Sequence, residues 1–182
     1  MTYVASLKKL EFLNLSATKV TDAGLKNLAE DKQLDGLDLS CTAVGDASLE
    51  YLGSLAKLRY LRLAGTRVTD AGLKNLAGNK SLQLLDLNES QVTDAGLKEL
   101  ASCANLCDLE LRHTKATDAG LKHLLGCKNL VRLNLQATQV TDVGLKELTA
   151  FKKLARVHVF PQQITDATLR TLLAASAGLR IG

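Results

Sequence analysis

Hydrophobic residues recur along this chain with a period of 24 residues, without insertion or deletion. Seven leucines mark the same position of successive units: Leu10, Leu34, Leu58, Leu82, Leu106, Leu130 and Leu154. A constant period of this size is typical of one supersecondary unit stacked on copies of itself. The pattern therefore predicts a solenoid of seven units with partial units at both ends, forming a single domain over residues 1–182.

Within a unit, the apolar spacing predicts a short strand followed by a short helix. Leu13 and Leu15 alternate with more variable residues, which places the leucines on one side of a strand. Leu25 and Leu28 then recur at a spacing of three, which suits one face of a helix. Each unit is thus expected to contribute one strand, one helix and one layer of a continuous core.

Polar residues recur between strand and helix. A hydroxyl column follows the strand at Thr18, Thr42, Thr66, Ser90, Thr114 and Thr138, until Gln162 interrupts it after Pro161. We expect these hydroxyls to pair with buried backbone groups at the turn.

An aspartate stands near each helix start, at Asp22, Asp46, Asp70, Asp94, Asp118, Asp142 and Asp166. A threonine usually precedes it, and we interpret the pair as helix capping rather than as a metal or catalytic site. The glycines at 24, 72, 96, 120 and 144 predict close packing there, not a phosphate-binding loop.

The repeated motif Leu-x-x-Leu-x-Leu-x-x-Thr-x-Val-Thr-Asp-Ala-Gly-Leu resembles the leucine-rich repeat family over residues 7–174. The form with threonine where many members carry asparagine is similar to short bacterial repeats of the planctomycete type, and to repeats of F-box substrate receptors and the bacterial effectors that imitate them. The resemblance implies an α/β horseshoe, with a concave parallel sheet and convex helices. It also implies a recognition module.

The outward-facing strand positions change at almost every unit, whereas the leucine columns hardly change. Acids occupy the middle units, and arginines with aromatic or histidine side chains occupy the last ones, a distribution that favours one docking orientation. We predict a protein partner across units three to seven, with Tyr60 and Phe160 as apolar anchors. The candidate residues are Tyr60, Arg62, Asp86, Asp108, Glu110, Arg112, Arg132, Arg156, His158 and Phe160. The alternative is that mixed charges only keep a concave sheet soluble.

The net charge of +4 gives little reason to expect nucleic acid. A basic stripe follows the helices at Lys26, Lys74, Lys98, Lys122, Lys146 and Arg170, with Glu50 interrupting it. Each basic residue lies four residues after a helix-starting aspartate, which predicts a solvated outer face with compensated charge. Nucleic-acid binding along this stripe is a less favoured alternative.

The four cysteines do not form a secreted disulfide pattern. Cys103 and Cys127 lie one period apart and are interpreted as small buried apolar side chains, and a bridge between them under oxidation stays open. A reducing, cytoplasmic setting follows from this cysteine usage. No apolar run reaches transmembrane length, so no membrane partner is expected.

No arrangement of residues predicts catalysis, a cofactor or a bound metal. His113 and His158 are expected near the concave side and His123 on the outer helix face, and Glu89 beside His113 makes too few metal ligands. Asp86 and Glu110 are stacked neighbours, but an open concave face lacks the walled pocket that acid–base chemistry needs. We therefore predict a non-enzymatic protein.

Both ends lack a clear polar cap, so we expect a segment of a longer protein, or ends that pair with something, including another copy. Residues 1–7 align with the second half of a helix, and residues 178–182 resemble the opening of an eighth strand. Besides protein recognition, a substrate-receptor fragment of a ubiquitin-ligase complex or an effector mimic, and a bare structural array, stay open.

Overall fold

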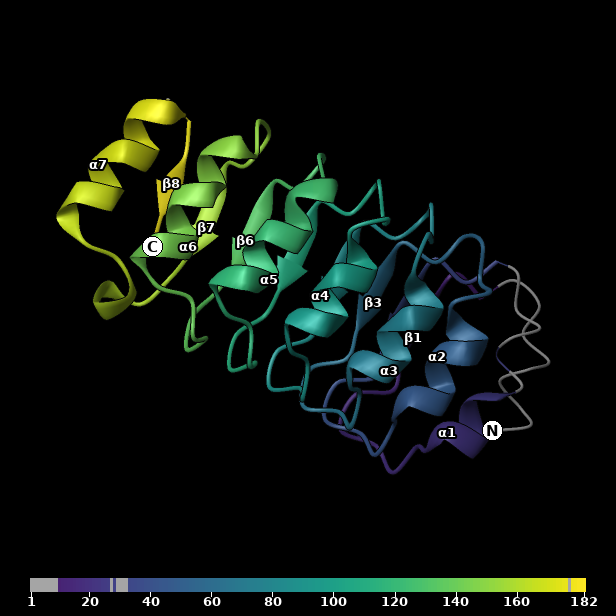
Figure 1. Ribbon diagram of the computed structural model, residues 1–182. Helices are drawn as coiled ribbons and strands as arrows, with labels where there is room; N and C mark the ends of the chain where they lie inside the picture. Colours follow the sequence, from purple (N-terminus) through teal and green to yellow (C-terminus); the bar gives the residue numbers. More distant parts are fainter. Residues whose placement is uncertain (1–9, 27, 29–32, 177) are drawn as a thin grey trace.

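The computed structural model describes residues 10–26, 28, 33–176 and 178–182 (Figure 1). Its strands form one eight-stranded parallel sheet in which spatial order follows chain order. They are β1 (Phe12–Asn14), β2 (Gly36–Asp38), β3 (Tyr60–Arg62), β4 (Leu84–Asp86), β5 (Asp108–Glu110), β6 (Arg132–Asn134), β7 (Arg156–His158) and β8 (Arg180–Ile181). The last strand confirms the expected opening of an eighth unit, while residues 1–7 lie outside the described ranges.

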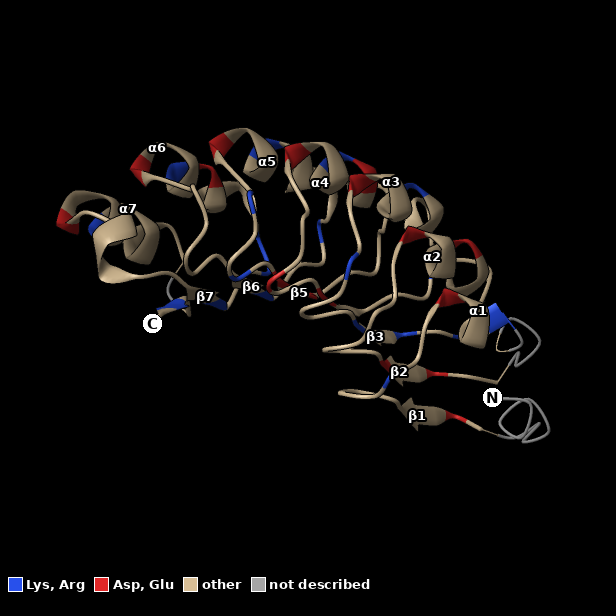
Figure 2. Ribbon diagram, turned by 90° about the horizontal axis from the view of Figure 1, so that it is seen from below, with Lys and Arg blue, Asp and Glu red and all other residues tan. Residues whose placement is uncertain are grey.

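Each strand from β1 to β7 connects to a helix on the opposite side of the unit. The α-helices are α1 (Asp22–Leu25), α2 (Asp46–Leu52), α3 (Asp70–Leu73), α4 (Asp94–Leu100), α5 (Asp118–His123), α6 (Asp142–Leu145) and α7 (Asp166–Ala175). Short 3-10 helices are η2 (Lys74–Leu76), η3 (Leu124–Gly126), η4 (Lys146–Ala150) and η5 (Pro161–Gln163). Figure 2 shows the strands on the inner side of an arc and the helices on its outer side. The predicted horseshoe is confirmed.

The core is a stack of leucine layers between sheet and helices. Every paired strand residue lies opposite the residue 24 positions later, as in Leu13↔Leu37 and Leu37↔Leu61. Leu58, Leu61, Leu63 and their equivalents in the central units are fully buried. Each such side chain contributes about 1.5–3 kcal/mol, so neighbouring layers hold one another without a common centre.

The turn after each strand from β1 to β6 contains a residue in the left-handed region. The φ angles lie between 54° and 63° at Ala17, Cys41, Gly65, Glu89, His113 and Ala137. Only one of these residues is glycine, so no glycine column revealed this conformation in the sequence. Pro161 stands at the same position of the last unit, and its ring forbids a positive φ. The chain forms η5 there instead.

Opposite substitutions test the left-handed turn. Ala137→Gly should raise the free energy of unfolding by about 0.5–1 kcal/mol, because release of the Cβ strain exceeds the extra chain entropy of glycine. Gly65→Ala should lower it by about 1 kcal/mol, although its new Cβ would meet nothing nearer than Cys41 Sγ at 3.6 Å. Urea denaturation measures both, and effects of the same sign would contradict the strain argument.

The hydroxyl column has the predicted role. The side chains of Thr18, Thr42, Thr66, Thr114 and Thr138 donate to the leucine carbonyl three residues earlier at 2.6–2.7 Å. The buried Ser90 hydroxyl has no partner among the described residues. In the last unit Gln163, rather than Gln162, reaches this region: its Nε2 donates to the Leu135 carbonyl at 3.0 Å and its Oε1 accepts the N–H of Phe160 at 2.9 Å.

The aspartate column joins units, so its interpretation as a cap of its own helix was wrong. The threonine before the aspartate is the N-cap, and in α3 to α6 its hydroxyl accepts a backbone N–H. Five of the aspartate carboxylates accept the N–H and the hydroxyl of the next unit's N-cap threonine, an arrangement that we call the junction. The junctions are Asp46–Thr69, Asp70–Thr93, Asp94–Thr117, Asp118–Thr141 and Asp142–Thr165.

The glycine column leaves room for the junction. A Cβ built on Gly120 would lie 2.4 Å from Asp94 Oδ1, and the equivalents at Gly96 and Gly144 are equally tight. The predicted close packing is confirmed. Unit two exchanges the two residue types: Gly45 replaces the threonine, Ser48 replaces the glycine, and the Ser48 hydroxyl donates to Asp22 Oδ1.

The cysteines carry free thiols. Buried Cys103 and Cys127 donate to the carbonyls of Leu76 and Leu100, each at 3.2 Å. Burial, with a smaller contribution from Cys103, raises the pKa of Cys127 to about 12. Both are the buried side chains that the sequence predicts.

Alkylation measures this burial. Iodoacetamide at pH 8 should modify exposed Cys41 rapidly, and Cys103 and Cys127 on the order of a hundredfold more slowly, because a buried protonated thiol reacts only after local opening. Mass spectrometry of peptides from timed samples gives the rates. Equal rates at Cys41 and Cys127 would contradict the burial.

Candidate binding surface

The strands line the concave inner side of the arc (Figure 2), and their constant register arranges the outward-facing positions in three rows. The first row is Phe12, Gly36, Tyr60, Leu84, Asp108, Arg132, Arg156 and Arg180. The second row is Asn14, Asp38, Arg62, Asp86, Glu110, Asn134 and His158. The third follows the strands at Ser16, Ser40, Ala64, Asn88, Arg112, Gln136 and Phe160. Constant register therefore places side chains 24 residues apart in direct contact range.

An aromatic hollow lies at the β1 to β4 end of this face. The rings of Phe12 and Tyr60 stack with centroids 6.2 Å apart and planes inclined by 26°, and Gly36 lies between them. A Cβ on Gly36 would lie 2.5 Å from the Phe12 ring, so the stack requires glycine there. The hollow has a volume of about 540 Å³ and is lined by Phe12, Leu13, Asn14, Gly36, Leu37, Asp38, Tyr60, Arg62 and Leu84.

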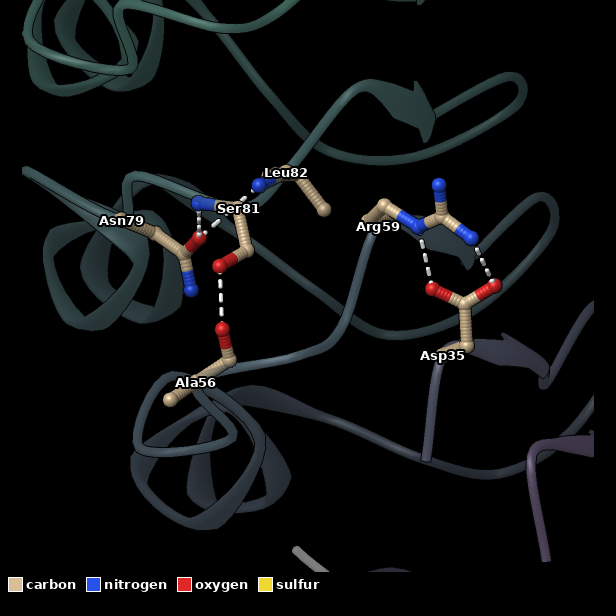
Figure 3. Close-up of polar contacts among 6 residues, drawn as sticks. All are labelled: Asp35, Ala56, Arg59, Asn79, Ser81 and Leu82. Carbon is tan, nitrogen blue, oxygen red and sulfur yellow. Dashed lines mark hydrogen bonds and ion pairs between the residues drawn. The ribbon is translucent and has the colours of Figure 1, made fainter. Parts of the chain in front are cut away.

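Residues just before the strands hold Tyr60 in place. The Arg59 guanidinium lies over the Tyr60 ring, 5.3 Å from its centroid. It forms two bonds with the Asp35 carboxylate, including Nη2 to Oδ2 at 2.7 Å (Figure 3). Asp35 is buried, so this ion pair fixes the guanidinium and with it one face of the ring.

Side-chain hydrogen bonds also hold the loop before β4, which lies near this ion pair (Figure 3). Asn79 Oδ1 accepts the backbone N–H groups of Ser81 and Leu82 at 2.8 and 2.9 Å, and the Ser81 hydroxyl donates to the Ala56 carbonyl. Asn79 lies in the column that holds Leu55 and Cys103 in other units. These bonds replace the apolar packing of those units.

The second row carries three carboxylates and one arginine over β2 to β5. Arg62 Nη1 lies 3.7 Å from Asp38 Oδ2, and Glu110 Oε2 accepts from Asn134 Nδ2 at 2.7 Å. Among the described residues, the Asp86 carboxylate accepts one hydrogen bond, from the N–H of Asn88 at 3.0 Å. Partial burial raises the pKa of Asp86, and Glu110 and Asp38 raise it further, against lowering effects of the Asn88 bond and of Arg62. The centre of the face is therefore short of positive charge.

The free energy of unfolding of the Asp86→Asn variant should show that the charged form of Asp86 destabilises the fold. A carboxyl group whose folded-state pKa is raised binds protons more tightly when folded, so wild-type stability falls as pH rises from the ordinary aspartate pKa through the raised value. The variant keeps an oxygen for the Asn88 N–H and loses the charge, so it should be more stable than wild type at pH 7. The gain should vanish near pH 3.5 in urea titrations. A pH-independent difference would contradict the assignment.

Arg132 has a structural role that its row position does not reveal. Its Nε donates to Asp108 Oδ2 at 2.7 Å, and the Asp108 side chain is only 8% exposed. The other Asp108 oxygen has no partner among the described residues. Removal of Arg132 would therefore leave a buried carboxylate without its main partner.

Exposed arginines occupy the β7 to β8 end of the face. Arg156 and Arg180 continue the first row beyond Arg132 and form no ion pair within the described part of the chain. In the third row, Arg112 Nη1 lies 4.0 Å from Glu89 Oε1. The backbone N–H of Arg112 donates to Asn88 Oδ1. His158 and Phe160 are half-buried beside them.

All ten candidate residues follow the rows that the sequence predicts, but they do not form one cluster. Tyr60 and Arg62 line the aromatic hollow, Asp86 and Glu110 lie in the centre, and Arg156 lies at the far end. Sequence reasoning put Phe160 forward as an anchor and missed Phe12, the partner of Tyr60. Two aromatic residues in one row with a glycine between them were the available signal.

Three further features of the described residues lie outside the concave face. No group of three or more potential metal ligands occurs among them. Within the described ranges, no helix combines the length and the apolarity needed to cross a bilayer. On the convex side, His123 is exposed on α5 as expected, and Lys122 lies 3.9 Å from Glu147 of the next unit. Asp142, four residues before Lys146, takes part in a junction, and Lys146 still makes a small contribution to the lowered pKa of its carboxyl group.

Solved structures from Listeria monocytogenes and Leptospira interrogans have the same architecture. An internalin of Listeria monocytogenes is 20% identical over 98% of this chain and 55% of its own, with a TM-score of 0.69. Internalin C2 of the same species is 24% identical over 98% and 82% of the two chains, with a TM-score of 0.68. A leucine-rich repeat protein of Leptospira interrogans is 20% identical over 100% and 51%, with a TM-score of 0.74. At these identities the likeness concerns the fold alone, and the chain spans about half the length of two of them.

Comparison of the sequence with curated proteins finds no significant match. A family model described as Leucine Rich repeat matches four segments, at residues 6–29, 54–77, 78–101 and 126–148. These segments make up just over half of the chain, and the unmatched units between them keep the same period and register. The chain belongs to the leucine-rich repeat family.

Proposed function

We propose that this chain is a non-enzymatic recognition module, folded as one domain over residues 1–182, that binds a protein partner on the concave face of its sheet. The observation that carries the proposal is the aromatic hollow, in which Phe12 and Tyr60 stack over Gly36. Neither the sheet nor the core requires this stack, since the equivalent positions of later units hold charged residues.

The free energy of binding is expected to come from the hollow and its surroundings. Phe12 is 61% exposed, so a partner side chain that covers it removes apolar surface from water. Arg59 and Asp35 hold Tyr60 before the partner arrives, which lowers the entropy cost of binding. The other rows supply polar contacts at the rim. The free thiols fit a reducing, cytoplasmic compartment.

The experiment is a capture from a lysate of the source organism with three baits: the native chain, a concave variant and a convex variant. The concave variant carries Tyr60→Ser and Arg62→Glu, and the Arg62 side chain is 56% exposed. The convex variant carries Lys74→Glu and Lys98→Glu, at exposed helix positions. Arg132 is left unchanged because its loss would disturb Asp108. Circular dichroism checks that all baits are folded.

A protein captured by the native and convex baits and lost by the concave bait would support the proposal. Equal capture by the native and concave baits would contradict it. Loss with the convex bait alone, together with bound nucleic acid, would favour the basic stripe instead.

A further inference from the structure

Three arginines lie side by side at the β6 to β8 end of the concave face. Arg132, Arg156 and Arg180 are direct register partners, and we call them the arginine row. Parallel strands are about 4.8 Å apart, so the row carries three positive charges along about 10 Å. All three residues are exposed, and only Arg132 has a carboxylate partner within the described part of the chain.

The fold explains Arg132, which pairs with Asp108, but it does not explain why Arg156 and Arg180 extend the row. Like charges directly opposite one another destabilise a sheet, and Gly36, Tyr60 and Leu84 occupy the same positions of earlier units. The core beneath is the same with or without arginine, because the buried Leu133, Val157 and partly buried Ile181 alternate with the row. An accumulation of charge that costs stability and that packing does not need points to a ligand of opposite charge.

We infer that the partner presents clustered carboxylate side chains to the arginine row, an inference that rests on the proposed function. The guanidinium group binds carboxylates through two parallel hydrogen bonds. In an extended segment, side chains on one side recur about every 6.8 Å. Two acidic residues spaced i and i+2 would therefore place their carboxylates next to the guanidinium groups of the unpaired Arg156 and Arg180. Arg132 lies beside Arg156 at the end of the row.

The charges around the row favour a protein over a nucleic acid. A group of carboxylates lies on β4 and β5, two to three strands away from Arg156 on β7: Asp86, Asp108 and Glu110. The pKa of Asp86 is already raised. A polyanion that continued across the face would meet these carboxylates. A protein segment can place acids at the row alone, and neutral, basic or apolar side chains further along.

The test uses nuclear magnetic resonance of the full chain, observing the arginine Nε–Hε signals. The probe is a seven-residue peptide of alternating serine and glutamate. A peptide with glutamine in place of glutamate and a thymidine tetranucleotide are the controls. The inference predicts saturable shifts of the Arg156 and Arg180 signals with the glutamate peptide. Binding should be at least tenfold weaker with glutamine, and likewise when Arg156→Gln and Arg180→Gln are combined.

Stability measurements on the same variants separate function from structure. The Arg156→Gln and Arg180→Gln variant should unfold at the same or a higher urea concentration than wild type, because it removes like-charge neighbours. Arg132→Gln should unfold at a lower concentration, because Asp108 loses its partner. A double variant that is less stable than wild type would show that the row is structural and would overturn the inference.

Equal binding of the glutamate and glutamine peptides would also overturn it, and so would tighter binding of the tetranucleotide. These outcomes leave the proposed function standing if the concave bait still loses its partner. Conversely, a glutamate-specific row combined with equal capture by native and concave baits would refute the proposed function and not the carboxylate preference.

Discussion

Replacement of Asp94 by alanine should lower the free energy of unfolding by about 3 kcal/mol, because hydrogen bonds to a charged group contribute about 1.5–3 kcal/mol each. Asp94 Oδ1 accepts the N–H of Thr117 at 2.8 Å, and Oδ2 accepts its hydroxyl at 2.6 Å. Both bonds cross from one unit to the next, so the variant also weakens the interface that couples neighbouring units.

Asp94→Asn is the matched control. It keeps an oxygen for the Thr117 N–H, and its amide can donate to the Thr117 hydroxyl, so about 1 kcal/mol of lost stability is expected. Urea denaturation gives both values, and hydrogen exchange of the Thr117 amide reports the junction itself. Equal losses for alanine and asparagine would contradict the junction.

The lowered pKa of Asp142, caused first by the Thr165 hydroxyl and N–H, agrees with stabilisation of the charged form by these bonds.

The second large effect is expected at the opposite side of the same junction. Gly120→Ser should lower the free energy of unfolding by about 2–3 kcal/mol, because overpacking of a tight contact costs that much. The new Cβ would lie 2.4 Å from Asp94 Oδ1 and 2.7 Å from Leu97 Cδ1. Thr117→Gly should cost about 1–2 kcal/mol through loss of the cap and of one junction bond.

Together the two substitutions should cost at least about 1 kcal/mol less than the sum of the single ones, because they share one partner. The chain itself contains this combination at Gly45 and Ser48, where the hydroxyl reaches Asp22 from the other position. A double-mutant cycle by urea denaturation measures the coupling. Strict additivity would show that the exchange in unit two is unrelated to the junction.

The fold was predictable because one spacing repeats throughout. The leucines fix which side of each strand is buried, and a constant period fixes the register, so the composition of each row follows directly. The role of the aspartates did not follow, because a threonine stands one residue before most of them and another stands 23 residues after most of them. Only the three-dimensional stack shows that the carboxylate bonds the second of these.

The left-handed turn was hidden for a different reason. Glycine usually marks this conformation, but five of the six residues that adopt it are other types. In the binding surface, Arg132 and Arg156 are equivalent by sequence, yet only Arg132 has a buried acid in the neighbouring unit. Such differences depend on which side chain stands one unit earlier, so they require the pairs to be examined in space.

The most direct test of the concave face is hydroxyl-radical footprinting of the captured complex. Tyr60, His158 and Phe160 lie on the concave face, whereas His123 and the 45%-exposed Leu173 lie on helices of the convex side. Binding on the concave face should slow oxidation of Phe12 and Tyr60 several-fold and leave His123 and Leu173 unchanged. Protection of His123 and Leu173, with the oxidation rates of Phe12 and Tyr60 unaltered, would contradict the account and place the partner on the helices.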